Sequence, residues 1–128
     1  MLLASAICSC SEKQPETSEP MITKTEIQVE NGHFTPEIMH RLGKVSDPQV
    51  SPDGSKILYG VTYTSIEQNK GNRELYLMNL DGSNNIKLTS TPKSESNARW
   101  ISDSQIVYMR GGKIYTATLE GGKLAAET

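Results

Sequence analysis

Apolar and polar residues alternate in a series of short stretches in the middle of the chain. Three of them are KILYGVTYT (56–64), RELYLMNL (73–80) and NIKLT (85–89). They are rich in β-branched and aromatic residues, and turn-forming sequences separate them, which is typical of antiparallel β-strands. A further short strand is expected at PQV (48–50). Residues 47–89 are therefore predicted to form four strands.

The same order of strands and turns returns between residues 97 and 122. Strands are expected at NARW (97–100), QIVYMR (105–110) and KIYTATL (113–119), with turns at ISDS (101–104) and at two Gly-Gly pairs. The two units align at Val50 with Trp100, Asp53 with Asp103, Tyr59 with Tyr108, Tyr76 with Tyr115, and Asp81-Gly82 with Gly121-Gly122. The alignment changes offset only where the predicted loop SIEQNKGN (65–72) is replaced by Gly-Gly, as expected of repeats that differ in their loops.

Repeats of 40 to 50 residues with four strands each are typical of β-propeller blades. The turn motifs of the first unit are Ser51, Pro52, Asp53 and Gly54, followed by Asp81 and Gly82. We predict an all-β fold: an incomplete β-propeller of about two four-stranded antiparallel blades, preceded by a short helix and a flexible N-terminal tail. An unrelated antiparallel meander is the alternative. Because propellers typically have about 4–8 blades, these residues are expected to open a longer protein.

A helix signature precedes the first repeat. Thr35 is a suitable N-cap, Pro36 suits the first helical position, and Glu37 complements the helix dipole. This predicts about seven helical residues with an apolar face that docks on the fold, ended by Gly43 in a left-handed conformation. His33 and His40 lack further ligands at a metal-binding spacing, so a surface role is expected for both.

The N-terminus changes abruptly from MLLASAICSC to the polar SEKQPETSEP. Ile7-Cys8-Ser9-Cys10 resembles a bacterial lipobox, with Cys10 as the residue that receives lipid. No basic residue precedes the apolar run, so a start further upstream is expected. A plain apolar N-terminus with two unused cysteines is the alternative. MITKTEIQV (21–29) alternates weakly and is a candidate edge strand.

These patterns divide the chain into five parts. Residues 1–10 form a partial lipoprotein-type signal peptide, 11–33 a flexible tether, 34–43 the short helix, 44–90 the first blade, and 91–128 a truncated second blade.

Composition narrows the possible partners. Thirteen basic and 15 acidic residues are interspersed and give a net charge of −2, without the basic stripe of a nucleic-acid-binding protein. No apolar run approaches the roughly 18 residues of a membrane span, so membrane contact is expected only through a lipid anchor.

No catalytic, metal-binding or cofactor-binding residue is predicted in this chain. Gly-x-Ser-x-Gly is absent, STPK (90–93) lacks the companion motifs of Ser-x-x-Lys enzymes, and DGSNN (81–85) lacks the downstream acid of a calcium loop.

Two stretches carry a family resemblance. SPDGSKILYGV (51–61) followed by RELYLMNLDGSNNIKLT (73–89) is similar to the WD40-like repeat of TolB-type propellers. TPEIMHRLGKVSDPQVSPDG (35–54) resembles the entry to the propeller in prolyl oligopeptidase-family serine peptidases of the dipeptidyl-peptidase and acylaminoacyl-peptidase-like branch. The resemblance covers about residues 34–122 and departs at 101–104, where Ile-Ser-Asp-Ser replaces Ser-Pro-Asp-Gly.

The resemblance implies that the propeller limits access to a Ser-Asp-His triad in a separate hydrolase domain, which this chain does not contain. It implies a fragment of a serine exopeptidase. With the lipobox-like Ile7–Cys10, it implies an exported protein, at the periplasm or the outer membrane as a bacterial lipoprotein. Its partners are peptide substrates, reached through the missing hydrolase domain, and missing blades that pack on these two. The alternative is a non-catalytic TolB-like propeller lipoprotein that binds protein or peptide partners. A third interpretation is a small domain that oligomerises to complete a ring.

Overall fold

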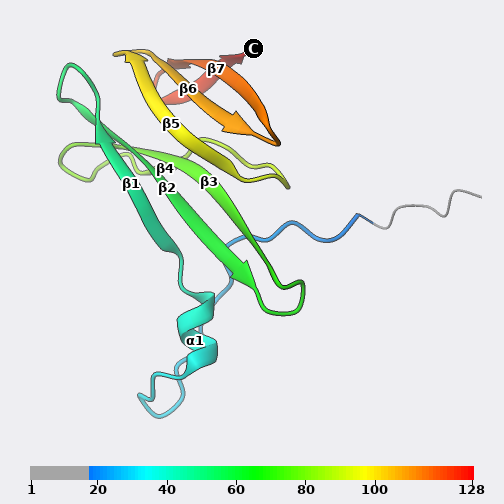
Figure 1. Ribbon diagram of the computed structural model, residues 1–128. Coiled ribbons are helices and arrows are strands. Elements are labelled where there is room, and N and C mark those ends of the chain that lie inside the picture. The colour runs from blue at the N-terminus through cyan, green and yellow to red at the C-terminus, as the bar shows by residue number, and fades with distance from the viewer. Residues whose placement is uncertain (1–17) are drawn as a thin grey trace, which may run out of the picture.

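A computed structural model describes residues 18–128 and contains two four-stranded antiparallel sheets and one short helix (Figure 1). The first sheet has the order β1-β2-β3-β4 and the second β5-β6-β7-β8. The predicted all-β class, with two four-stranded antiparallel units, is therefore confirmed. The strands of the first sheet are β1 (Lys44–Val50), β2 (Lys56–Ser65), β3 (Lys70–Asn79) and β4 (Ile86–Lys87), and those of the second are β5 (Glu95–Ser102), β6 (Gln105–Arg110), β7 (Lys113–Glu120) and β8 (Lys123–Glu127).

The predicted loop between β2 and β3 was too long. A tight hairpin replaces it: the Asn69 amide donates to the Ile66 carbonyl at 3.1 Å, and Asn69 has a φ of 49°. Strand pairing therefore continues down to Ser65 opposite Lys70. The structure also places the fourth strand of the second unit, β8, at residues to which no strand was assigned, because KLAAE carries no clear alternation of apolar and polar residues.

Helix α1 spans Pro36–Arg41, with Thr35 as the N-cap that accepts a hydrogen bond from the Ile38 amide at 3.3 Å. The predicted helix end was wrong. The chain leaves the helix at Leu42 in an extended conformation, with φ −65° and ψ 136°, and Gly43 has no positive φ. Gly43 instead allows a close approach, since a Cβ there would lie 2.9 Å from side-chain atoms of Tyr63 and Val61.

The expected docking of the helix is only partial. No residue of α1 is buried, and Met39 and Leu42 are 49% and 43% exposed. The candidate edge strand at residues 21–29 is not formed, since these residues have no strand structure.

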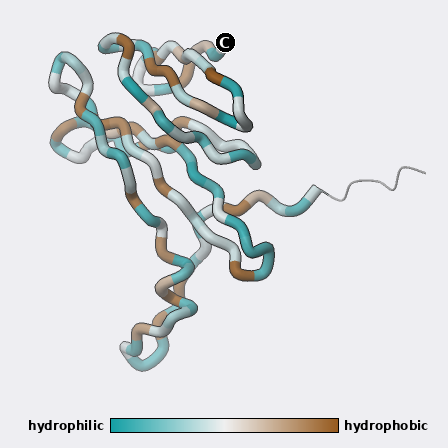
Figure 2. Tube along the Cα trace, in the orientation of Figure 1, coloured by the Kyte–Doolittle hydropathy of each residue, from teal (hydrophilic) through white to brown (hydrophobic). Residues whose placement is uncertain are grey.

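The hydrophobic core lies where the two sheets face each other. Apolar and polar positions alternate along the strands (Figure 2), so each strand turns alternate side chains into this space. The buried residues are Leu58, Leu75 and Leu77 from the first sheet and Ala98, Ile106, Tyr108, Ala117 and Leu119 from the second. This contact between the sheets is referred to below as the internal interface.

The two sheets share local geometry at aligned positions. Tyr59 and Tyr76 lie opposite each other and stack with ring centroids 5.6 Å apart, as Tyr108 and Tyr115 do at 5.9 Å. The first strand of each sheet is interrupted by a bulge, which contains a residue with positive φ: Asp47 at 52° in β1 and Asn97 at 53° in β5. The aligned residues therefore occupy matching places in the two sheets.

Arg73 of β3 links the first strands of the two sheets. Its guanidinium donates to the Glu95 carbonyl at 2.9 Å and to Ser46 Oγ at 3.2 Å. It lies directly over Gly60, where a Cβ would be 2.2 Å from the guanidinium carbon. Gly60 therefore provides the space in which Arg73 crosses from one sheet to the other.

Gly60→Ala is expected to displace the Arg73 side chain and destabilise the fold by about 1–2 kcal/mol, because Arg73 loses hydrogen bonds to Ser46 and Glu95. Chemical denaturation of Gly60→Ala, Arg73→Ala and the double variant measures this. The two changes are expected to be non-additive, because both remove the same contacts. Gly71→Ala is the matched control, since its Cβ meets no atom closer than 3.4 Å. Additive effects, or equal losses from Gly60→Ala and Gly71→Ala, contradict this account.

Candidate functional site

A cluster of buried polar residues lies where the chain passes from the first sheet to the second. Strand β4 ends after two residues, and the Leu88 amide then donates to the Leu75 carbonyl at 2.7 Å. The hydroxyl of Thr89 accepts from the Leu75 amide at 2.9 Å, so a side chain takes the place of a strand carbonyl. Residues 88–94, the connecting segment, are held against the edge of β3 in this way.

Glu95 is the most buried charged residue described, with 0% exposure. Its two carboxylate oxygens accept from the hydroxyls of Thr89 at 2.9 Å and Thr91 at 2.7 Å, and Arg110 Nη1 lies 3.7 Å away. A buried carboxylate is tolerated only with such partners. The connecting segment therefore supplies both hydroxyl donors to the first residue of the second sheet.

Arg110 continues this network towards the second sheet. Its guanidinium lies 2.6 Å from a carboxylate oxygen of Glu127 in β8 and 4.3 Å from the ring centroid of Tyr115. Burial raises the pKa of the Glu127 carboxyl, and the nearby negative charge of Glu95 raises it further. The Arg110 guanidinium is thus shared by the carboxylates of Glu95 and Glu127.

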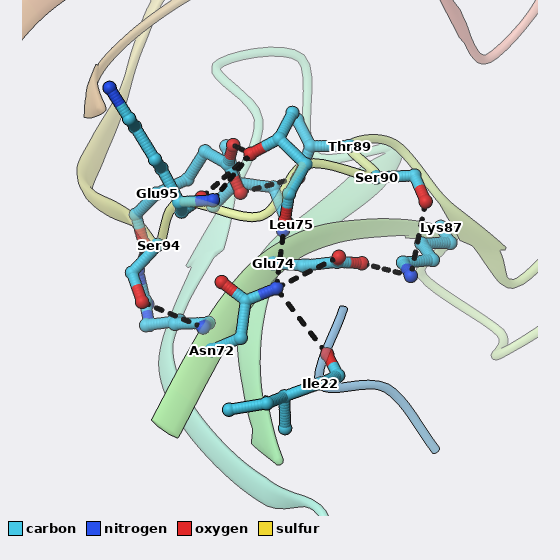
Figure 3. A network of polar contacts seen from close by, with 12 residues as sticks. Ile22, Asn72, Glu74, Leu75, Lys87, Thr89, Ser90, Ser94 and Glu95 are labelled. Carbon is cyan, nitrogen blue, oxygen red and sulfur yellow. Dashed lines mark hydrogen bonds and ion pairs between the residues drawn. The ribbon is translucent and has the colours of Figure 1, made fainter. Parts of the chain in front are cut away.

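Asn72 and Glu74 form the other half of the cluster, and both are 3% exposed (Figure 3). The side-chain amide of Asn72 donates to the Glu74 carboxylate at 3.2 Å, to the Thr91 carbonyl at 2.8 Å and to the Ile22 carbonyl at 3.4 Å. Glu74 also forms an ion pair with Lys87 of β4. Burial lowers the pKa of Lys87, whereas the charge of Glu95 acts in the opposite direction.

These charged groups are paired within the chain, so the cluster is suited to fixing the two sheets rather than to acid–base chemistry. This cluster was not predicted from the sequence. A weak signal was present in NRELYL (72–77), where Asn and Glu lie two residues apart at the start of an apolar stretch. Their burial depends on the connecting segment and could not be predicted from the strand alone.

A second polar surface is accessible to solvent. Asp47 and Arg99, on the first strands of the two sheets, form an ion pair at 2.8 Å in which their side chains remain 38% and 54% exposed. Gln49 donates to the Ala98 carbonyl at 2.7 Å, and the Trp100 indole donates to the Gln49 carbonyl at 3.3 Å. The hydrogen bond from Arg99 lowers the pKa of Asp47. Asp47, Gln49 and Arg99 are referred to as the first-strand surface.

The first predicted turn motif forms a network of its own. The Gly54 amide donates to the Ser51 carbonyl at 2.9 Å, and Gly54 has a φ of 74°. Asp53 Oδ1 accepts from Ser51 Oγ at 2.6 Å and from the Ser55 amide at 3.0 Å. The hydrogen bond from Ser51 has the largest effect on the pKa of Asp53, and together with those from Ser55 it lowers this pKa to about 2. Pro52 is exposed beside them.

At the second turn motif, the Gly82 amide donates to the Asn79 carbonyl at 2.9 Å, and Gly82 has a φ of 84°. Asp81 Oδ1 accepts from both the amide and the hydroxyl of Ser83, at 2.9 and 2.6 Å. Asp81 is thus engaged locally in the hairpin. Cys10, the predicted lipidation site, lies outside the described residues.

Other candidate motifs do not assemble into a site. Within residues 18–128 no group of three or more His, Cys, Asp or Glu side chains is arranged to hold a metal ion. Ser90 Oγ accepts from Lys87 Nζ at 3.5 Å. No helix in that same part of the chain is long and apolar enough to span a membrane.

The chain is similar in sequence to known peptidases. No family model matches the sequence. Two curated dipeptidyl peptidases are similar to it, and each is named dipeptidyl-peptidase 5. That of Porphyromonas gingivalis is 36% identical over 92 residues, or 72% of this chain, and that of Porphyromonas endodontalis is 30% identical over 86 residues, or 66%. The match spans 12% of the length of each relative. The chain is therefore related to a segment of these dipeptidyl peptidases.

Glu95→Gln is expected to destabilise the fold by about 2–3 kcal/mol, because it removes the buried charge that Arg110 and two hydroxyls compensate. The free energy of unfolding from urea titration measures this. Glu19→Gln is the control, since Glu19 pairs with Lys70 on the surface, where both side chains are about 60% exposed, and should lose less than about 1 kcal/mol. Equal losses from the two variants contradict a stabilising role for the buried cluster.

Stability is also expected to fall between about pH 4 and pH 2 through Asp53. Its pKa is lowered from 3.8 to about 2 in the folded chain, so its contribution is present above the unfolded value and is lost as the pH falls through the folded one. Urea titrations at several pH values, for the wild type and for Asp53→Asn, measure this. The wild type should show the steeper loss over that range, and identical slopes contradict the prediction.

Proposed function

We propose that this chain is a propeller segment of an exported serine exopeptidase of the prolyl oligopeptidase family, in which it limits the access of substrates to a hydrolase domain. The observation that carries the proposal is the 36% identity over 92 residues with a dipeptidyl-peptidase 5. Two similar four-stranded sheets in one chain support it, because repeated four-stranded units are the building blocks of propellers.

In this proposal the segment limits substrate access, and the catalytic residues lie in the hydrolase domain. Peptides are the substrates of the whole protein, and the nucleophile, base and acid belong to the hydrolase domain. The buried cluster around Glu95 holds the two sheets in a fixed relation. The first-strand surface of Asp47, Gln49 and Arg99 presents hydrogen-bonding groups to a passing peptide. Lipid attachment at Cys10 would hold the protein at the membrane.

A non-catalytic, TolB-like binding propeller is the second candidate. It is favoured by the first repeat, SPDGSKILYGV with RELYLMNLDG, which peptidases share with binding propellers. Under this alternative, the same first-strand surface binds a protein or peptide partner without cleaving it.

The first test is the coding sequence on both sides of these 128 codons. The peptidase proposal expects a downstream in-frame Gly-x-Ser-x-Gly followed by Asp and His, and a basic segment upstream of the apolar N-terminus. The extended protein is then expected to release dipeptides from peptide N-termini and to react with a fluorophosphonate probe. Only further blades before a stop codon, or no reaction with the probe, supports the binding propeller instead.

The gating role and the anchor have separate readouts in the extended protein. Glu95→Gln is expected to raise the cleavage of long polypeptides relative to dipeptidyl substrates, because it loosens the contact between the sheets, whereas Glu19→Gln leaves that ratio unchanged. An unchanged ratio in both variants contradicts gating. Cys10→Ser is expected to release the protein from membranes, and Cys8→Ser is the matched control.

A further inference from the structure

A tight turn lies between the N-terminal segment and helix α1. The His33 amide donates to the Glu30 carbonyl at 3.2 Å, and the two residues between them, Asn31 and Gly32, have φ values of 53° and 69°. Both residues are exposed. Glycine and asparagine adopt left-handed φ values more readily than other residues, so the sequence favours this turn locally.

The same two residues place a nucleophile next to an electrophile. The backbone nitrogen of Gly32 can attack the side-chain carbonyl carbon of Asn31, and no Cβ on residue 32 shields that nitrogen. The attack forms a five-membered succinimide and releases the side-chain nitrogen as ammonia. Water then opens the ring at either carbonyl and leaves aspartate or isoaspartate. One ammonia is lost for each water taken up, so the reaction requires no other reactant.

The backbone around this turn can reach the reactive geometry at low cost. Residues 18–35 contain neither helix nor strand, and the hydrogen bond from His33 to Glu30 joins two exposed residues. Exposed segments with few buried contacts open locally at little cost in free energy. The fold therefore does not hold Asn31 away from the attacking nitrogen.

Two other turns, Asp53-Gly54 and Asp81-Gly82, provide an internal comparison. Their glycines also have positive φ values, of 74° and 84°. The aspartates, however, are held as carboxylates, because the hydrogen bond from the Ser51 hydroxyl lowers the pKa of Asp53 and that from the Ser83 hydroxyl lowers the pKa of Asp81. An ionised carboxylate is a poor target for a backbone nitrogen, so these turns are protected.

Three other asparagines in the described part of the chain share the left-handed conformation. They are Asn69, Asn84 and Asn97, with φ values of 49°, 51° and 53°. The residues that follow them are Lys70, Asn85 and Ala98, and each has a Cβ that shields its backbone nitrogen. Asn31-Gly32 is the only Asn-Gly pair in the sequence. The reactive combination is therefore confined to this turn.

We propose that Asn31 is a modification site, at which the Gly32 nitrogen closes a succinimide on the asparagine side chain and so converts it to aspartate and isoaspartate. The reaction joins two neighbouring residues, so it does not depend on further blades or on a hydrolase domain. The proposal goes beyond the proposed function and is independent of peptidase activity.

Both products change the connection between the N-terminal segment and the helix. Each places a new negative charge next to Glu30. Isoaspartate also directs the main chain through the former side chain and lengthens it by one carbon, so the turn cannot keep its present conformation. The modification therefore alters how residues 18–30 approach helix α1.

Incubation of the 128-residue chain at mildly alkaline pH, with samples taken over several days, tests the proposal. The intact mass is expected to rise by the difference between an NH₂ and an OH group, and peptide mapping should place the change and the isoaspartate at residue 31. Gly32→Ala is expected to slow the reaction at least about tenfold, because a Cβ then shields the nitrogen. Gly82→Ala is the matched control and should leave the rate unchanged, since both glycines have positive φ and open space around a Cβ.

A parallel incubation in urea separates the chemistry of the pair from protection by the fold. The rate at Asn31 in the folded chain is expected to lie within about tenfold of the rate in urea, because opening the turn costs little. A larger difference overturns the proposal, since the fold then protects the residue. Modification confined to other asparagines overturns it as well, and equal rates in the wild type and Gly32→Ala overturn the succinimide route.

Discussion

An apolar face of a four-stranded sheet is stabilised when another sheet covers it, and the rest of this structure depends on that packing of one sheet on the other. Leu58, Leu75 and Leu77 become buried because the second sheet lies against them. A two-residue β4 contributes little pairing, so neighbouring segments complete the first sheet. Packing between the sheets therefore supplies burial that neither sheet supplies alone.

The buried carboxylate of Glu95 makes this packing specific. Apolar contacts tolerate sliding, whereas a buried charge is stable only where its partners converge. Those partners come from the connecting segment and from β6, through Thr89, Thr91 and Arg110. A sheet displaced by one residue would leave the carboxylate without them. The polar cluster therefore disfavours alternative registers, and the apolar contacts supply the driving force.

The elements that could be predicted from the sequence are those determined by neighbouring residues. Alternation identified most of the strands, and the capping chemistry of Thr35 and Pro36 identified the helix. The predicted end of the helix was wrong because Gly43 does not adopt a left-handed conformation. A glycine fits at this position because a Cβ would lie too close to Tyr63 and Val61.

The features whose residues could not be assigned from the sequence depend on contacts between distant residues. Strand β8 forms because β7 offers an edge for pairing, and the positive φ values of Asp47 and Asn97 arise where bulges interrupt the first strands. The buried cluster was missed for the same reason. A turn such as Ser51–Gly54 is determined by its own residues, whereas a buried glutamate is recognisable only once the segment that covers it has been placed.

In the proposed peptidase, the gating role of this segment depends on an equilibrium between closed and open arrangements of the sheets. Every 1.4 kcal/mol removed from the closed arrangement raises the open population about tenfold. The residues between the sheets therefore influence both stability and access, and a loss of stability by itself does not identify a gate. The two effects separate in the ratio of long to short substrates cleaved, because unfolding lowers both rates while opening changes their ratio. The Glu95 charge is buried at the contact between the sheets, so its substitution affects both stability and access. Substitution of the exposed Glu19, which pairs with Lys70, is the reference.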